Sequence, residues 1–213
     1  MKSLDQSTIR KQNVRRILDL LTAQSPKTRQ SLAEATGLSL MTVTNLVDQL
    51  KTQQVLELAP VARCSDAKRI SGRKAENISL NGSGHAWMII DLSGRNFRYV
   101  LMGFDLSPLH EQNCSKEGDY LPRLEAFLCD IHAELDSLLL GRKLLGVAVV
   151  VPGPYEIASD TVFNQRLPEL NAVRIKALLQ RCLGDYNYYV DEDVKFAVRA
   201  FAPLIEQDPC ELL

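Results

Sequence analysis

Small polar side chains recur along one face of a predicted helix that begins near residue 40. The outward positions of this helix include Met41, Thr42, Thr44 and Asn45. Hydroxyl and amide groups of this size can donate to and accept from the edges of base pairs, and helical spacing brings them to one side. These residue types at this spacing indicate a helix that reads the major groove of double-stranded DNA.

Basic residues accompany this helix, which suits a polyanionic partner. Arg29 precedes it and Lys51 lies at its end, and we expect both to contact phosphates. A polar, basic stretch follows at residues 60–73, and a solvated, disordered loop is the alternative interpretation of it. Three basic residues lie in this stretch or directly after it. We expect them to lie over a phosphate backbone or a narrow minor groove: Arg69, Arg73 and Lys74.

The element that positions the reading face is a predicted helix-turn-helix over residues 29–51. Apolar residues recur within each half at the spacing of one buried helical stripe. Between the halves, Gly37 suits the left-handed residue that ends a helix, and Ser39 suits the N-cap of the next helix. We also include Ser39 among the DNA-binding residues. An ordinary helical hairpin with a polar outer face is the alternative.

The neighbouring segments extend this motif to a winged helix. Residues 8–23 have helical spacing and precede the helix-turn-helix, with Thr28 as the expected N-cap of the second helix. Strand-like runs follow at residues 55–58 and 76–80, on either side of the basic stretch. Three helices followed by a two-stranded ribbon with a basic loop form a winged helix.

The charge distribution divides the chain into two modules. The first 80 residues carry 13 Lys and Arg against 7 Asp and Glu, a net charge of +6. The remaining residues carry 12 against 19, a net charge of −7. Opposite signs suggest different partners, and the basic half carries the helix-turn-helix.

Composition excludes several other classes of protein. The chain is 46% apolar and 24% charged, as soluble globular proteins are, and no apolar run reaches the length of a membrane helix. The polar N-terminus does not resemble a signal peptide, so we expect a cytoplasmic protein without a membrane partner. The five cysteines are widely spaced, with no CxxC and no histidine at ligand spacing, which argues against a metal site and a disulfide framework.

From residue 85 the pattern changes to an α/β arrangement. The run 144–151 (LLGVAVVV) is the most apolar and is expected at the centre of a sheet with both faces covered. The other predicted elements are strands or extended segments at 86–92, 97–104, 105–113 and 186–190, and helices at 122–140, 171–182 and 194–205.

The N-terminal motifs resemble the DNA-binding domain of ROK-family repressors, the family of NagC-, XylR- and Mlc-type regulators and related sugar kinases. The matching motifs are residues 13–18 (NVRRIL), 28–33 (TRQSLA), 36–39 (TGLS), 42–44 (TVT) and 46–47 (LV). The usual Gly-Gly-Arg-Pro-like wing turn reads SGRK at residues 71–74, which keeps glycine and arginine. The resemblance implies a winged helix-turn-helix domain over residues 1–80.

The second module resembles the first lobe of the ROK module more weakly. Residues 91–94 (DLSG) stand at the family's phosphate turn, 146–154 (GVAVVVPGP) at its glycine-containing strand and turn, and 190–195 (VDEDVK) at its Val-Glu-Asn-Asp-Ala-Asn motif. The resemblance implies that residues 85–213 form a truncated α/β half-module of the actin and hexokinase (ribonuclease H-like) type. The predicted fold class is therefore a multidomain α+β protein.

The same resemblance bears on catalysis. In the family's kinases, the aspartate of the last motif acts as a base on a sugar hydroxyl, and Asp193 matches it. Glu192 and Lys195 replace asparagines that hold the sugar, and Ser93 replaces a glycine of the phosphate turn. The acidic run 191–193 can equally start a helix, where carboxylates are favourable. Because the sequence ends before the family's nucleotide- and zinc-binding lobe, we expect no enzyme activity, no metal and no cofactor.

Together these observations favour a sequence-specific DNA-binding transcription regulator. We expect a repressor of sugar-related genes that acts as a homodimer, since a two-fold site requires two copies. Binding of a sugar effector by the single lobe is left open. The alternatives are a remnant sugar kinase that uses Asp193, and a protein-interaction module tethered by a basic domain.

Overall fold

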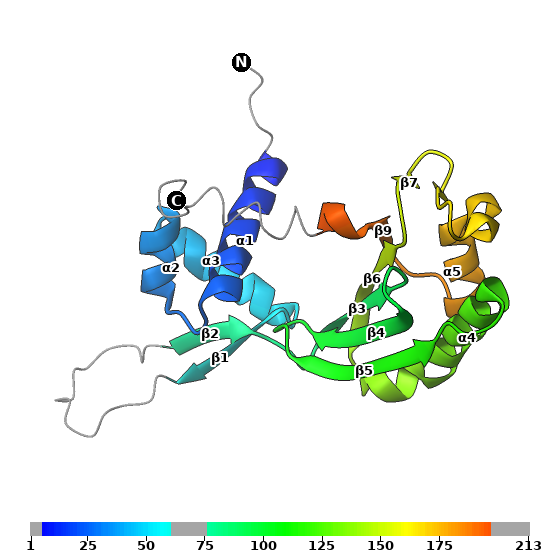
Figure 1. Cartoon of the computed structure of the whole chain (residues 1–213). Helices are drawn as coiled ribbons and strands as arrows, with labels where there is room; N and C mark the ends of the chain where they lie inside the picture. Colours follow the sequence, from blue (N-terminus) through cyan, green and yellow to red (C-terminus); the bar gives the residue numbers. More distant parts are fainter. Residues whose placement is uncertain (1–5, 61–75, 197–213) are drawn as a thin grey trace, which may run out of the picture. The chain divides into compact units, whose positions relative to one another are not determined.

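The computed structural model describes residues 6–60 and 76–196 (Figure 1). By its internal contacts the chain divides into two compact units. The first comprises Met1–His85 with Gly103–Ser107, and the second comprises Ala86–Met102 with Pro108–Leu213. Each unit has a hydrophobic core of its own, as expected of a separate domain. The assignment of Gly103–Ser107 to the first unit was not anticipated by the expected boundary between residues 80 and 85.

Three helices open the first unit: α1 (Gln6–Ala23), α2 (Arg29–Thr36) and α3 (Leu40–Thr52). The side chain of Thr28 caps α2 in a reciprocal capping box with Ser31. Gly37 ends α2 with a φ of 71°, in the left-handed region. The three helices, the Thr28 cap and Gly37 are confirmed as predicted, except that α1 begins two residues earlier than expected.

A two-stranded ribbon, the wing, follows the helices. β1 (Leu56–Pro60) pairs with β2 (Glu76–Leu80) in antiparallel register, with Leu56 opposite Leu80. The first strand therefore begins one residue later than predicted. Lys27 adds an isolated bridge to Ile78 at the middle of β2. The predicted DNA-binding residues Arg69, Arg73 and Lys74 lie outside the described residues.

One apolar core joins the helices and the wing. Each helix turns its apolar stripe inward, and both wing strands contribute. The buried residues of this core are Ile17, Leu21, Leu32, Val43, Leu46, Val47, Leu50, Leu56, Ile78 and Leu80. Because α3 packs through this stripe, its opposite face remains free.

The second unit is built on a mixed five-stranded sheet. Its strands are β3 (His85–Asp91), β4 (Asn96–Gly103), β5 (Pro108–Ser115), β6 (Lys143–Val151) and β9 (Tyr188–Glu192). Their spatial order is β5-β4-β3-β6-β9, with β4 and β5 antiparallel and β6 and β9 parallel. The order of strands and helices along the chain is the α/β arrangement predicted from the sequence.

Two helices, α4 (Tyr120–Leu139) and α5 (Ile175–Leu183), cover one side of this sheet (Figure 1). α4 begins two residues earlier than predicted, because Pro122 is tolerated in the first helical turn, where its missing N–H is not required. The predicted helix 171–182 begins later, since residues Pro168–Ala172 form a 3₁₀ turn, η1. A small hairpin, β7 (Tyr155–Glu156) and β8 (Thr161–Val162), precedes this turn.

The prediction that both faces of β6 are covered is wrong. Val147, Val149 and Val151 are buried, whereas Ala148 and Val150 between them are only half-buried. Such alternation is typical of a strand with one covered face, and α4 and α5 lie on the same side of the sheet. Among the predicted residues of the closing helix 194–205, the structure describes Val194 to Phe196 as helical, and the remainder lies outside the described part.

Over residues 6–60 and 76–196, no helix combines the length and the apolar character that crossing a membrane requires. In the same part of the chain, no three His, Cys, Asp or Glu side chains gather in a group that could hold a metal ion. Cys114, Cys129 and Cys182 are free thiols.

Candidate nucleic-acid interface

The outer face of α3 carries the predicted base-reading residues. Met41 is 71% exposed, Asn45 is exposed, and Thr42 and Thr44 are half-buried at the margins. Because Val43, Leu46, Val47 and Leu50 hold α3 in the core, these side chains are presented on a rigid element. The structure thus brings Thr42, Thr44 and Asn45 to one side of α3 together with the exposed apolar side chain of Met41, an arrangement suited to a recognition helix.

The start of α3 is fixed by Ser39. Its hydroxyl accepts a hydrogen bond from the Thr42 amide at 3.1 Å and lies 2.9 Å from the Thr42 hydroxyl. This satisfies one of the free N–H groups at the helix start. The Ser39 side chain therefore has a capping function in the free protein, and its predicted contact with DNA stays a prediction.

Lys51 lies in the last turn of α3 and is exposed. A cation is favourable there because the carbonyl end of a helix carries partial negative charge. An exposed ammonium group at the end of α3 can reach a phosphate oxygen as a point charge.

Arg29 has surroundings that could not be predicted from the sequence. Its Nη2 donates to Asp48 Oδ1 at 2.7 Å and its Nη1 donates to Glu76 Oε2 at 2.6 Å. Its side chain is 16% exposed. Burial lowers the pKa of the guanidinium, but the hydrogen bonds to Glu76 and Asp48 outweigh this and raise the pKa above its ordinary value.

These bonds change the expected role of Arg29. We predicted a phosphate contact, whereas the guanidinium already holds two carboxylates, from α3 and from the wing. Glu76 and Asp48 were missed as functional partners. The available signal was their acidity within a basic module, but Glu76 lies 47 residues from Arg29 in the sequence.

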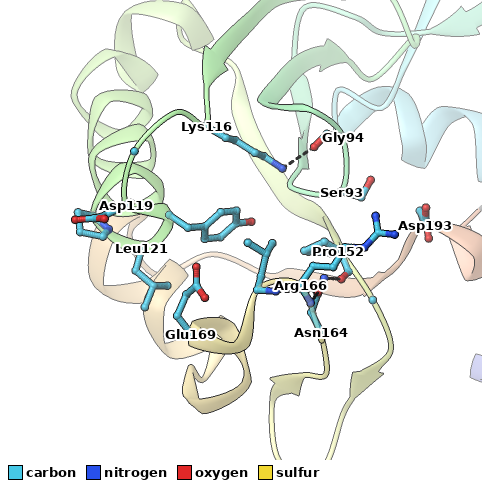
Figure 2. Close-up of a pocket in the computed structure, with 15 residues that line it drawn as sticks. Ser93, Gly94, Lys116, Asp119, Leu121, Pro152, Asn164, Arg166, Glu169 and Asp193 are labelled. Atoms are coloured by element: carbon cyan, nitrogen blue, oxygen red, sulfur yellow. Dashed lines mark hydrogen bonds between the residues drawn. The ribbon is translucent and has the colours of Figure 1, made fainter.

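The second unit contains a cavity of about 860 Å³ (Figure 2). It brings together residues from the three segments that were compared with a sugar-kinase site. The lining residues from these segments and their surroundings include Ser93, Gly94, Lys116, Asn164, Arg166 and Asp193.

The turn that corresponds to the phosphate turn is closed by its own hydrogen bonds. Asp91 Oδ1 accepts from the Ser93 amide at 2.8 Å and from the Ser93 hydroxyl at 2.7 Å. The Leu92 amide donates to the Val150 carbonyl at 2.8 Å. Two amides of the turn are therefore already engaged, whereas a phosphate-binding turn offers such groups to its ligand.

Lys116 crosses this turn. Its Nζ donates to the carbonyls of Leu92 at 2.6 Å and Gly94 at 2.7 Å, and it lies 4.9 Å from the centre of the Phe97 ring. Burial lowers the pKa of this ammonium group, and the charge of Asp91 partly opposes the shift. The side chain thus ties the end of β5 to the β3–β4 turn.

Asp193, which the resemblance matched to a catalytic base of sugar kinases, is exposed at the cavity. Its Oδ1 accepts a hydrogen bond from the Val194 amide at 2.8 Å, and in Figure 2 the Arg166 side chain reaches toward it. Lys195 lies 3.1 Å from Glu192 and 3.5 Å from Asp191. Such contacts are typical of the start of a helix, and here an amide and an ammonium group of the same chain contact the carboxylates.

Comparison with known proteins gives a match to a protein family and similarities to solved structures. Residues 10–57 match a family of winged helix-turn-helix DNA-binding domains. A ROK family transcriptional regulator, a homologue of the E. coli MLC protein, superposes with a TM-score of 0.62 at 17% identity, over 93% of this chain and 48% of that one. A glucokinase from Parabacteroides distasonis gives a TM-score of 0.42 at 15% identity, over 52% and 31%.

None of the curated proteins compared with the sequence matches it. The chain spans about half the length of the ROK family structure that it matches, 48% of that chain. The family match confirms the predicted winged helix-turn-helix, and the structural match confirms the fold that the ROK resemblance implied. The N-terminal part of the chain is a winged helix-turn-helix DNA-binding domain, and the chain as a whole shares its fold with a ROK family transcriptional regulator.

Proposed function

We propose that this protein is a transcription regulator that binds a specific DNA sequence through α3. The observation that carries the proposal is the division of α3 into a face buried in a winged-helix core and an outer face that carries Thr42, Thr44 and Asn45 beside the exposed Met41. The buried face fixes the helix, and the free face supplies donors and acceptors for base edges. The net charge of +6 on the first 80 residues supports attraction to a polyanion.

Binding of the full chain to genomic fragments at several salt concentrations tests this proposal. A chain with both Thr44→Ala and Asn45→Ala should lose its preference among fragments, because these side chains are at the reading face. Gln30→Ala, at an exposed site on α2, is the matched control and should keep the preference. Binding without sequence preference, unchanged in the double variant, would contradict the proposal.

We further propose that the second unit does not transfer phosphate. Support comes from the turn at residues 91–94, whose amides of Leu92 and Ser93 are engaged within the protein and whose carbonyls hold Lys116. A coupled assay of ATP turnover across a panel of hexoses should give no signal above the background without protein. Turnover that disappears in Asp193→Asn would instead identify a sugar kinase.

We propose that the regulator acts as a homodimer and represses sugar-related genes. A winged helix that reads a two-fold site requires two copies of α3 related by the same symmetry. The ROK resemblance in the sequence supports the choice of target genes. Transcript levels after deletion of the gene should rise for operons next to bound sites, and a fall would indicate an activator.

A further inference from the structure

We propose that Arg29 is a positioning residue that sets the wing against the recognition helix through Asp48 and Glu76, and that it does not contact phosphate. The inference rests on the proposed function, because it assigns parts within the same DNA-reading surface. It replaces the role that the sequence suggested for this arginine.

The geometry joins three elements at one guanidinium group. Arg29 is the first residue of α2, Asp48 lies on α3, and Glu76 is the first residue of β2. One terminal nitrogen bonds each carboxylate, at 2.7 Å and 2.6 Å. Charge-assisted bonds from a planar guanidinium fix direction as well as distance, so the bridge defines an orientation between α3 and β2.

The remaining nitrogen shows that the group is enclosed. Arg29 Nε is buried and has no hydrogen-bond partner within the described residues. The side chain is 16% exposed, and each terminal nitrogen already donates to a carboxylate, so a phosphate brought to this group would lie next to Asp48 and Glu76. Repulsion between the phosphate and these two carboxylates is unfavourable.

The backbone beside Arg29 holds the same strand at a second point. Lys27 and Ile78 exchange two backbone hydrogen bonds, of 3.0 Å and 2.7 Å, and Ile78 is fully buried. β2 is thus fixed at its middle by Lys27 and at its first residue by Arg29. The Arg29–Glu76 bond therefore acts at the end of β2 that adjoins residues 61–75 in the sequence.

The charges give the proposal a distinctive consequence. The cluster contains one cation and two anions, and an isolated acid near DNA weakens binding by repulsion. If Arg29 contacted phosphate, removal of Glu76 would strengthen binding. If the three residues position the wing, removal of Glu76 weakens binding to the specific site although it removes a negative charge.

The test uses the full chain, a duplex carrying the selected site and a scrambled duplex. Affinity is measured against salt for the wild type, Arg29→Lys, Arg29→Met, Glu76→Ala and the double variant of Arg29→Met with Glu76→Ala. Glu57→Ala is the matched control, because Glu57 is an exposed acid on the other wing strand. We expect Glu76→Ala and Arg29→Lys each to weaken specific binding about tenfold, with the salt slope unchanged and Glu57→Ala at or above wild-type affinity.

A phosphate contact gives a different result. Arg29→Lys would then retain most of the affinity, Arg29→Met would lower the salt slope by about 0.9, and Glu76→Ala would bind more tightly. That pattern overturns the positioning role while leaving the proposed function intact. If the wild type shows no preference for any duplex, the proposed function fails and this inference fails with it.

The same set of variants is checked for loss of folding. Thermal unfolding is recorded for each variant, and affinities are compared below the onset of unfolding. The double variant Arg29→Met with Glu76→Ala should lose no more affinity than Arg29→Met alone, because both changes break the same bridge. Additive losses would contradict the bridge even if each single variant binds weakly.

Discussion

At the scale of single residues, the turn between α2 and α3 depends on backbone conformations that few residue types allow. Gly37 has a φ of 71°, and a Cβ placed there would meet no atom within 4 Å. Glycine is therefore favoured at this position by the backbone conformation and not by a lack of space for a side chain. Ser39, two residues later, supplies the cap that starts α3.

A Gly37→Ala substitution should lower the free energy of unfolding by about 1 kcal/mol, because the left-handed conformation disfavours a Cβ. Denaturant unfolding of the full chain measures this change. Gly37→Asn is the control and should lose less, since asparagine tolerates this region better. Equal stability of the alanine variant and the wild type would contradict the explanation.

Lys51 should act on every DNA sequence alike. Its exposed ammonium group is suited to a phosphate and not to a base edge. We expect Lys51→Ala to weaken binding to specific and scrambled duplexes by similar factors and to reduce the salt slope by about one. Lys143→Ala removes an exposed lysine from the second unit and should leave the slope unchanged. A change confined to one sequence would assign Lys51 to base recognition.

The residues that could be predicted from sequence are those with local requirements. Thr28, Gly37 and Ser39 act on backbone within a few positions, so their types and spacing suffice. For Arg29 we predicted a contact with phosphate. Its actual partner could not be predicted, because Glu76 is distant in the sequence and the burial of Arg29 depends on tertiary packing. Periodicity carries no information on such a bridge.

At the scale of elements, α4 secures the second unit through its aromatic contacts. Phe127 is 3% exposed, and its ring stacks on that of Phe97 in β4 with centroids 5.4 Å apart. Phe97 also meets Tyr120 at the start of α4, edge to face, at 5.1 Å. The helix is thereby held against the covered side of the sheet.

Phe127→Ala should lower the free energy of unfolding of the second unit by about 3 to 5 kcal/mol, through lost burial and the cavity left behind. Asp130→Ala, at an exposed site on the same helix, should change it by less than about 0.5 kcal/mol. Chemical denaturation followed by circular dichroism compares the two. A loss for Phe127→Ala no larger than that for Asp130→Ala would show that α4 is not packed as described.

Element types and order could be predicted, whereas the coverage of the sheet could not. The run 144–151 consists of apolar residues at nearly every position, so it carries no alternation that distinguishes one covered face from two. Which face is covered depends on where α4 and α5 pack, and that is a property of the connections between strands. The 3₁₀ turn at Pro168–Ala172 was missed for a similar reason, because its spacing resembles the start of a helix.

At the scale of the whole molecule, the chain has two separate hydrophobic cores, and its two parts carry net charges of opposite sign. The first 80 residues have a net charge of +6 and the remainder −7. The proposed dimer places two basic modules on one duplex, which adds their phosphate contacts.

We therefore expect two copies of the chain on one duplex that carries the full two-fold site. Native mass spectrometry of the complex measures the stoichiometry directly. A duplex with a single half-site should bind at least tenfold more weakly, because the second copy no longer contributes contacts. Equal affinity for half-site and full site, with one copy bound, would contradict dimeric recognition.

The central claim is that the polar face of α3 selects DNA sequences. Genome-wide occupancy of the wild-type chain, compared with a chain carrying Thr44→Ala and Asn45→Ala at equal abundance, tests it most directly. We predict discrete sites that share a two-fold sequence motif in the wild type and the loss of these sites in the variant. Diffuse occupancy without a common motif, equal in both chains, would contradict the account.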